Sequence, residues 1–92
     1  MMQLLERNFK AVVDRGLITP ETCDVDFFLK LKEEVEEVAT EIINGDHYAM
    51  EREIVDCLIT CSNWLIHSGA NMPYLLVQNA IKNEERAKRC KK

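Results

Sequence analysis

The sequence predicts an all-α protein in which four helices form one domain over residues 1–92. Two observations favour helices over strands. Apolar residues recur every three or four positions along most of the chain, and only three glycines and two prolines interrupt this pattern. A chain of 92 residues has room for only a modest core, so self-association is an expected source of further burial.

The first two helices are separated by a short connector. Residues 2–15 carry apolar side chains at helical spacing, and Gly16 follows as a residue that commonly ends helices. A second helix extends to about residue 44. Its start lies either at Thr19-Pro20-Glu21 or within Asp24-Val25-Asp26, because both segments contain residues typical of helix N-termini.

The remaining elements are a third and a fourth helix. Asn44-Gly45-Asp46 is a turn sequence, and the helical pattern resumes over about residues 48–68 before Ser68-Gly69. A fourth helix begins near Asn71-Met72-Pro73 and extends to about residue 89. There is no internal repeat and no sign of a second domain.

The second helix, about 24–44, has a broad apolar arc and acidic residues beside it. Glu34 is expected at the edge of this arc and Glu37 next to it, whereas Glu33 and Glu36 point to solvent. We expect the arc to be the core face. Its members are Phe27, Phe28, Leu31, Val35, Val38, Ala39 and Ile42.

The third helix is apolar around most of its circumference, which is typical of a helix buried on several sides. Its remaining stripe carries no Lys or Arg after Arg52. Carboxylates on a largely buried helix are unfavourable unless they are paired or coordinated. The stripe consists of Glu53, Asp56, Thr60, Asn63 and His67.

Two acidic pairs, Glu34-x-x-Glu37 and Glu53-x-x-Asp56, are separated by 15 residues on these consecutive helices. Residues three apart share a helical face, so antiparallel neighbours would bring four carboxylates to one point. Each pair alone is typical of a solvated helix face. Together they favour a site for a hard divalent cation, Mg²⁺, for which Mn²⁺ is a possible substitute.

Composition excludes several other classes. The net charge of −4 gives no electrostatic basis for general nucleic-acid binding, and the basic tail, residues 88–92, is interpreted as a solvated helix end. No apolar segment approaches the length of a membrane span or of a signal peptide, so we expect a cytoplasmic protein without a membrane partner. The four cysteines lack zinc-ligand spacing and are expected to be reduced.

Two segments of the sequence resemble the MazG-like branch of the all-α nucleoside triphosphate pyrophosphohydrolases. Lys30-Leu31-Lys32-Glu33-Glu34-Val35-Glu36-Glu37 and Glu53-Ile54-Val55-Asp56 match both parts of the family signature. Asn83-Glu84-Glu85-Arg86 is similar to a later Lys…Asn-x-x-Arg element, although Lys82 directly precedes the asparagine instead of standing about one turn before it. The resemblance covers about residues 26–89.

The resemblance implies a MazG-like four-helix bundle that assembles as a homodimer or as a dimer of dimers. It also implies Mg²⁺-dependent hydrolysis of a nucleoside triphosphate to the monophosphate, NMP or dNMP, and pyrophosphate, as in cleaning of nucleotide pools. A neighbouring subunit would help to complete the nucleotide pocket. By position, the metal ligands would be Glu34, Glu37, Glu53 and Asp56, the catalytic residues Glu37 and Glu53, and the substrate-binding residues Lys30, Asn83 and Arg86.

Two alternatives remain open. A phosphoribosyl-ATP pyrophosphatase-like enzyme would share the acidic residues, but its aromatic-His pair is missing after Asp56, where Cys57 follows. A non-catalytic helical interaction module would keep the carboxylates without turnover. A di-iron bundle would require Glu-x-x-His on two helices, which neither His47 nor His67 provides. The preferred base and sugar are not encoded by any short motif.

Overall fold

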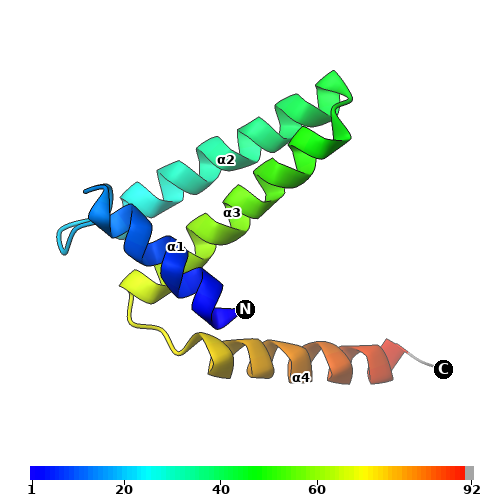
Figure 1. The fold of residues 1–92 in the computed structure, drawn as a ribbon. Helices are drawn as coiled ribbons and strands as arrows, with labels where there is room; N and C mark the ends of the chain where they lie inside the picture. Colours follow the sequence, from blue (N-terminus) through cyan, green and yellow to red (C-terminus); the bar gives the residue numbers. More distant parts are fainter. Residues whose placement is uncertain (91–92) are drawn as a thin grey trace.

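The computed structural model describes residues 1–90, and over this range it contains four α-helices and no strand (Figure 1). The expected helices are therefore all present. Lys91 and Lys92, the end of the basic tail, lie outside the described residues. None of the helices is both long enough and apolar enough to span a membrane. The helices are α1, Met2–Asp14; α2, Asp24–Asn44; α3, His47–His67; and α4, Met72–Cys90.

A tight turn joins α2 and α3 into an antiparallel hairpin. Gly45 has a φ of +73°, a left-handed conformation that ends α2 and that glycine adopts without strain. Asp46 then caps α3, since its side chain accepts a hydrogen bond from the backbone N–H of Ala49 at 3.0 Å. Because the turn is so short, α3 runs back along α2 for its whole length (Figure 1).

Of the two candidate starts of the second helix, the later one is correct. Cys23 is the last residue before α2, and its backbone N–H donates to the carboxylate of Asp26 at 3.0 Å. This hydrogen bond satisfies a donor at the helix start and lowers the pKa of Asp26. Thr19 instead belongs to a turn in the connector, where its carbonyl accepts from the N–H of Thr22.

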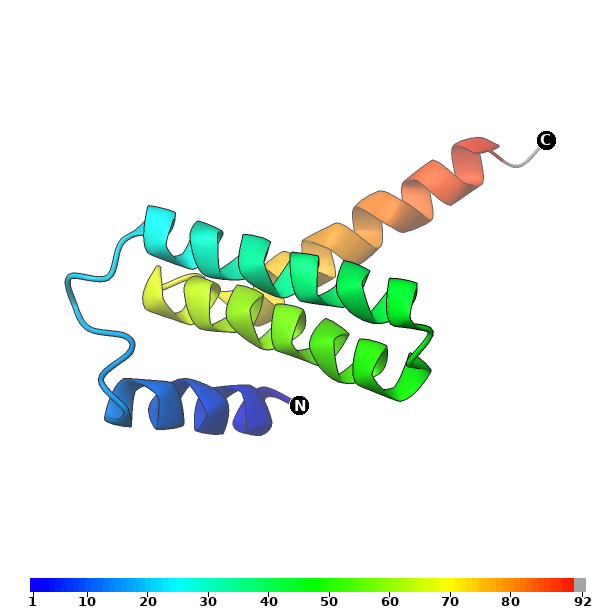
Figure 2. The same cartoon turned by 90° about the horizontal axis from the view of Figure 1, so that it is seen from above.

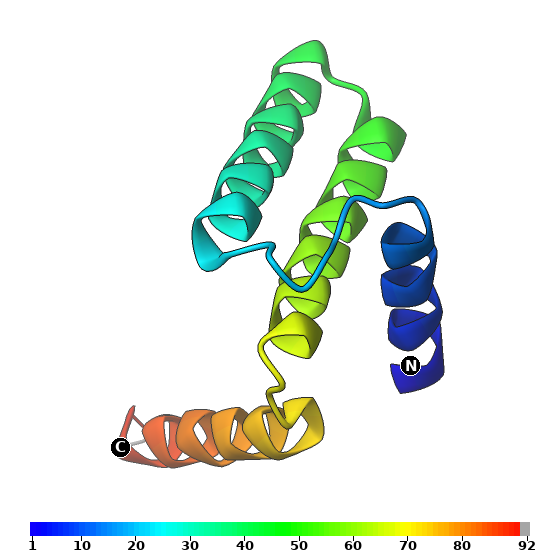
Figure 3. The same ribbon diagram turned by 90° about the vertical axis from the view of Figure 1, so that its left-hand side faces the viewer.

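The connector between α1 and α2 crosses α3, so α1 and α2 lie on opposite sides of α3 (Figures 2 and 3). Ile18 of this connector is buried. Its conformation is held by α3: Nε2 of His67 lies 2.9 Å from the carbonyl oxygen of Thr19, and the indole N–H of Trp64 donates to Asp24 Oδ1 at 2.9 Å. His67 of the α3 polar stripe therefore makes a structural hydrogen bond to the connector.

Helix α4 points away from the other three helices in all three views (Figures 1, 2 and 3). Met72 at its beginning is buried, but every residue from 73 to 90 is exposed. The four helices therefore do not close into a bundle within one chain.

The expected core face of α2 is wrong in part. Phe27 is buried, but Phe28, Val35 and Ile42 are between 53% and 60% exposed. By contrast, Glu34 is only 6% exposed, although it was expected at the edge of the apolar arc. An apolar arc indicates a preference for burial, but it does not identify the element that covers it. In this chain α3 faces the stripe that contains Glu34, and part of the adjoining apolar arc, at Phe28, Val35 and Ile42, stays exposed over residues 1–90.

The same reversal occurs on α3. The predicted polar stripe is turned inward, with Thr60 and Asn63 buried, whereas Ile54, Val55 and Leu58 are about half exposed. The hairpin therefore buries several polar side chains on its inner face and exposes several apolar ones on its outer faces.

Candidate metal centre

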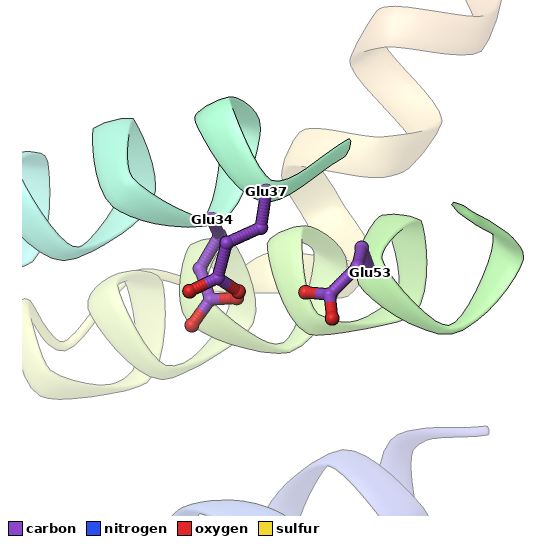
Figure 4. Close-up of side chains that lie close together, drawn as sticks. All are labelled: Glu34, Glu37 and Glu53. Atoms are coloured by element: carbon purple, nitrogen blue, oxygen red, sulfur yellow. The ribbon is translucent and has the colours of Figure 1, made fainter. Parts of the chain in front are cut away.

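Three carboxylates meet between the two helices of the hairpin. Glu34 and Glu37 project from α2 and Glu53 from α3, and one oxygen of each lies within 4.8 Å of the others. Figure 4 shows the three side chains pointing toward one another from facing helices. The i,i+3 spacing places Glu34 and Glu37 on one face of α2, and the short turn sets α3 opposite that face. We call these three residues the acidic cluster.

The acidic cluster is poorly supplied with hydrogen-bond donors. Oε2 of Glu34 and Oε2 of Glu53 are both inaccessible to solvent, and neither accepts a hydrogen bond from any of the residues described. A buried carboxylate oxygen without a partner is energetically unfavourable, because it has lost water and gained nothing in return. This pattern fits oxygens that are completed by a ligand.

Lys30 supplies the nearest positive charge. Its Nζ lies 3.0 Å from Glu34 Oε1 and 3.8 Å from Oε1 of the exposed Glu33. The hydrogen bond to Glu34 raises the pKa of Lys30 above its ordinary value, so the ammonium form is favoured at neutral pH. One lysine offsets the charge of one carboxylate, and the acidic cluster keeps a net negative charge.

Glu37 has the most strongly perturbed carboxyl group. A hydrogen bond shared with Glu53 is the largest cause, and partial desolvation and the charges of Glu34 and Glu53 add to it; together they raise the pKa of Glu37 to about 7. The pair can hold a proton between its carboxylates at a pH where an isolated glutamate is fully ionised. A divalent cation would compete with that proton for the same oxygens.

Asp56, the fourth predicted ligand, lies beside the acidic cluster and does not belong to it. Its carboxylate is outside the group of three, but Asp56 and Glu34 line the same cavity. Desolvation, followed by the negative charges of Glu34 and Glu53, raises the pKa of Asp56. Asp56 is therefore electrostatically coupled to the cluster, although it is more exposed than Glu53.

The predicted substrate-binding residues divide into two groups. Lys30 is at the acidic cluster, as described above. Asn83 and Arg86 lie on the exposed part of α4, where Asn83 donates to Asn79 Oδ1 at 3.0 Å. Because α4 does not pack against the hairpin, this chain does not bring Asn83 or Arg86 to its own acidic cluster (Figure 1).

A cavity of about 540 Å³ extends from the acidic cluster toward the connector. It lies between α1, the connector and the hairpin, and Lys30, Glu34 and Asp56 line one part of it. Several of its residues were not expected to form a site. The continuation of the α3 polar stripe predicted Thr60 and Asn63 as candidates. Arg15 and Ile18 lie in the connector, which carries no motif, and Phe27 was expected in the core. These additional lining residues include Arg15, Ile18, Phe27, Thr60 and Asn63.

The donor set of the acidic cluster consists only of carboxylate oxygens, which are the ligands preferred by hard cations such as Mg²⁺. Two of these oxygens lack any other partner, so the residues present are chemically suited to such an ion. The free cysteines Cys57 and Cys61 do not belong to any group of three potential metal ligands among the described residues. Comparison of this chain with protein-family models, curated proteins and solved structures finds no match.

Proposed function

We propose that this protein is a Mg²⁺-dependent nucleoside triphosphate pyrophosphohydrolase with a MazG-like fold, which converts an NTP or dNTP to the monophosphate and pyrophosphate. One observation carries the proposal: Glu34, Glu37 and Glu53 converge from two facing helices with two buried oxygens unpartnered. The resemblance of both acidic segments to the family signature supplies the reaction class. A role in cleaning nucleotide pools, in the cytoplasm, is part of this proposal.

The acidic cluster would hold the metal, with Asp56 available at its border. When bound there, Mg²⁺, or Mn²⁺ in its place, would supply neutralisation of the triphosphate and of the departing pyrophosphate. Without such a counter-charge, the triphosphate would be repelled by three carboxylates, of which Lys30 offsets only one.

The residues of the chain would contribute two further functions. Lys30 reaches the border between the acidic cluster and the cavity, so its ammonium group can contact a phosphate there while it orients Glu34. Glu37 lies within the acidic cluster, so a carboxylate oxygen of it that is not used in coordination would be placed to accept a proton from an attacking water. The carboxylate of Glu53 would hold the metal beside this base, since one oxygen of each residue lies within 4.8 Å of the other.

Self-association as a homodimer or homotetramer is the second part of the proposal. The chain exposes 7266 Å², whereas a compact monomer of 10.7 kDa exposes about 5,500 Å². The difference, roughly 1,800 Å², is comparable to the area that one chain buries in an obligate dimer. The radius of gyration is 15.9 Å, against about 12 Å for a compact domain of this length.

The projecting α4 explains how the remaining predicted substrate residues could take part. Asn83 and Arg86 are too far along α4 to reach the acidic cluster of their own chain. A second chain packed on the hairpin would be the element able to receive them. In that arrangement each nucleotide site would contain residues of two subunits.

The test is a panel of canonical and modified NTPs and dNTPs, together with phosphoribosyl-ATP, incubated with the purified protein and Mg²⁺. We expect release of pyrophosphate and of the monophosphate, and no release of single phosphate. Glu53→Gln and Asp56→Asn should both lose activity, whereas Glu33→Gln, which changes an exposed glutamate on the same hairpin, should keep it. Retained turnover in Glu53→Gln would contradict the proposal.

A non-catalytic helical interaction module is the second candidate, favoured by the exposed apolar residues of α2, α3 and α4. It predicts no turnover with any member of the panel and no increase in thermal stability on addition of Mg²⁺. An enzyme of the proposed kind predicts both effects, so the same samples separate the two candidates.

A further inference from the structure

We propose that the cavity beside the acidic cluster binds the nucleoside part of the substrate and that Asn63 hydrogen-bonds the edge of the base. This inference rests on the proposed function, since it takes the acidic cluster as the position of the phosphates. Three observations support the inference: the position of the cavity, the change in polarity along the cavity, and the unpartnered side-chain oxygen of Asn63.

The position and size of the cavity suit a nucleoside. Its volume of about 540 Å³ lies within the usual range of small-molecule sites. Its walls come from α1, the connector, α2 and α3, so an occupant would contact four segments of the chain. One part of it opens directly at Lys30 and Glu34, so a molecule inside can extend its charged end into the acidic cluster.

The polarity of the cavity changes along its length in the same sense as that of a nucleotide. Phe27 lies seven residues before Glu34 on α2, and Asn63 lies seven residues after Asp56 on the antiparallel α3. Seven residues of helix span roughly 10 Å. The charged end of the cavity, at Glu34 and Asp56, is therefore separated from the end that offers the ring of Phe27 and the carboxamide of Asn63. This separation suits a nucleotide, in which a sugar joins the base to the 5′ phosphate.

Asn63 is a buried polar residue whose side-chain oxygen, Oδ1, has no hydrogen-bond partner among the described residues. It is only 5% exposed, and it lines the cavity. A carboxamide offers one acceptor and two donors. The Watson–Crick edge of every base presents an N–H donor next to an acceptor, so an entering base can satisfy Oδ1 and accept from Nδ2 together.

Trp64 gives a direct readout of occupancy. It is the only tryptophan of the chain, and its ring is stacked on that of Phe27 with centroids 6.0 Å apart. Phe27 lines the cavity, whereas Trp64 lies behind it. A base that packs against Phe27 should therefore change the fluorescence of Trp64 without any need for turnover.

The experiment titrates the protein, in the presence of Mg²⁺, with nucleoside 5′-monophosphates of the common bases and with ribose 5-phosphate as a ligand without a base. Trp64 fluorescence and calorimetry report binding. We expect at least one monophosphate to bind at least tenfold more tightly than ribose 5-phosphate. Equal affinity for both kinds of ligand, or no binding of any monophosphate, would overturn the assignment of the cavity.

Substitutions then test Asn63 itself. Asn63→Leu and Asn63→Ala should each weaken binding of the preferred monophosphate at least tenfold. If Asn63→Leu does not fold, the test uses Asn63→Ala alone. Ser62→Ala is the matched control: Ser62 is also buried on α3 with an unpartnered Oγ, but it does not line the cavity. Unchanged affinity in both Asn63 variants, or an equal loss in Ser62→Ala, would contradict the role of Asn63.

This design separates the two proposals. Asn63-dependent binding of monophosphates without turnover of any triphosphate would remove the proposed function and leave the nucleoside cavity. Turnover that is abolished by Glu53→Gln but unaffected in rate and base preference by Asn63→Ala would remove the nucleoside cavity and leave the proposed function.

Discussion

The inner and outer faces of the α2–α3 hairpin differ, and the usual arrangement of a folded domain is reversed at several positions. The inner face buries Glu34, Thr60 and Asn63, while the outer faces expose Val35 and Leu58. In a domain stabilised by its own core, the apolar residues would lie between the helices and the carboxylates would lie in water.

The difference shows that the two faces have different requirements. Exposed apolar area favours any arrangement that removes it from water, which the outer faces could achieve against a second chain. Buried carboxylates gain nothing from packing and are satisfied only by donors or by a cation. The inner face therefore has the properties of a site, and the outer faces have those of an interface.

The largest effect should come from the inner face. Glu34→Gln removes one charge from the acidic cluster without changing its shape, and we expect activity to fall on the order of 10³-fold, equivalent to about 4 kcal/mol of transition-state stabilisation. The metal-free variant should be as stable as the wild type or more stable, because repulsion between Glu34 and its acidic neighbours is reduced. Initial rates with Mg²⁺ and urea unfolding with EDTA measure the two quantities.

Glu33→Gln is the control for this prediction, since Glu33 lies one residue earlier and is exposed. Its rate should stay within about twofold of the wild-type rate, because an exposed substitution away from the site has a small effect. A Glu34→Gln variant with normal activity and lower metal-free stability would make the inner face structural.

The outer faces should give the next largest effect. Val35→Glu places a charge in the apolar arc of α2, and burying an unpaired charge in an interface should weaken self-association about 100-fold, or by about 3 kcal/mol. Thr40→Glu adds the same charge to an exposed position of α2 outside this arc. Light scattering over a concentration series should detect dissociation in Val35→Glu alone. A wild-type protein that is monomeric at all concentrations would show that the outer faces are not an interface between copies.

The local features that the sequence predicted correctly are those determined by neighbouring residues. Gly45 and Asp46 define the hairpin turn, and the i,i+3 spacing of Glu34 and Glu37 places them on one face. Both depend on backbone geometry within a few positions. Because the turn is short, α3 lies opposite this face, and Glu53 points toward Glu34 and Glu37.

The features that were not predictable depend on which surfaces meet. Glu34 and Val35 are adjacent in sequence, and no local rule decides which of them α3 covers. The direction of α4 depends in the same way on contacts that residues 73–90 do not make within this chain. The cavity at Asn63 is formed in part by the connector, and Trp64 and His67 bond to Asp24 and Thr19 at its end, 40 and 48 positions away.

A smaller effect should appear in the pH dependence of stability without metal. The pKa of Glu37 is raised from 4.5 to about 7 in the folded protein, so its contribution to stability is complete below pH 4.5 and is lost as the pH rises through 7. The urea midpoint in EDTA should therefore decrease from pH 4.5 to pH 8, and Glu37→Gln should decrease less. Asp56, whose pKa is also raised, acts in the same direction.

Mg²⁺ should oppose this decrease, because the ion binds the deprotonated carboxylates and stabilises the folded state more as the pH increases. Parallel pH profiles for the wild type and Glu37→Gln in EDTA would show that Glu37 and Glu53 do not share a proton.

The smallest effect distinguishes a hydrogen bond that connects two elements from an ion pair on one helix. Trp64→Phe keeps an aromatic ring against Phe27 but removes the donor to Asp24, and we expect unfolding to become easier by about 1 kcal/mol. Lys10→Ala removes the exposed pair with Asp14, whose Nζ–Oδ2 distance is 2.9 Å, and should have a smaller effect, because solvent screens an exposed ion pair. Urea unfolding at one pH compares both variants. Equal losses would mean that the junction between α2 and α3 is as solvated as the surface of α1.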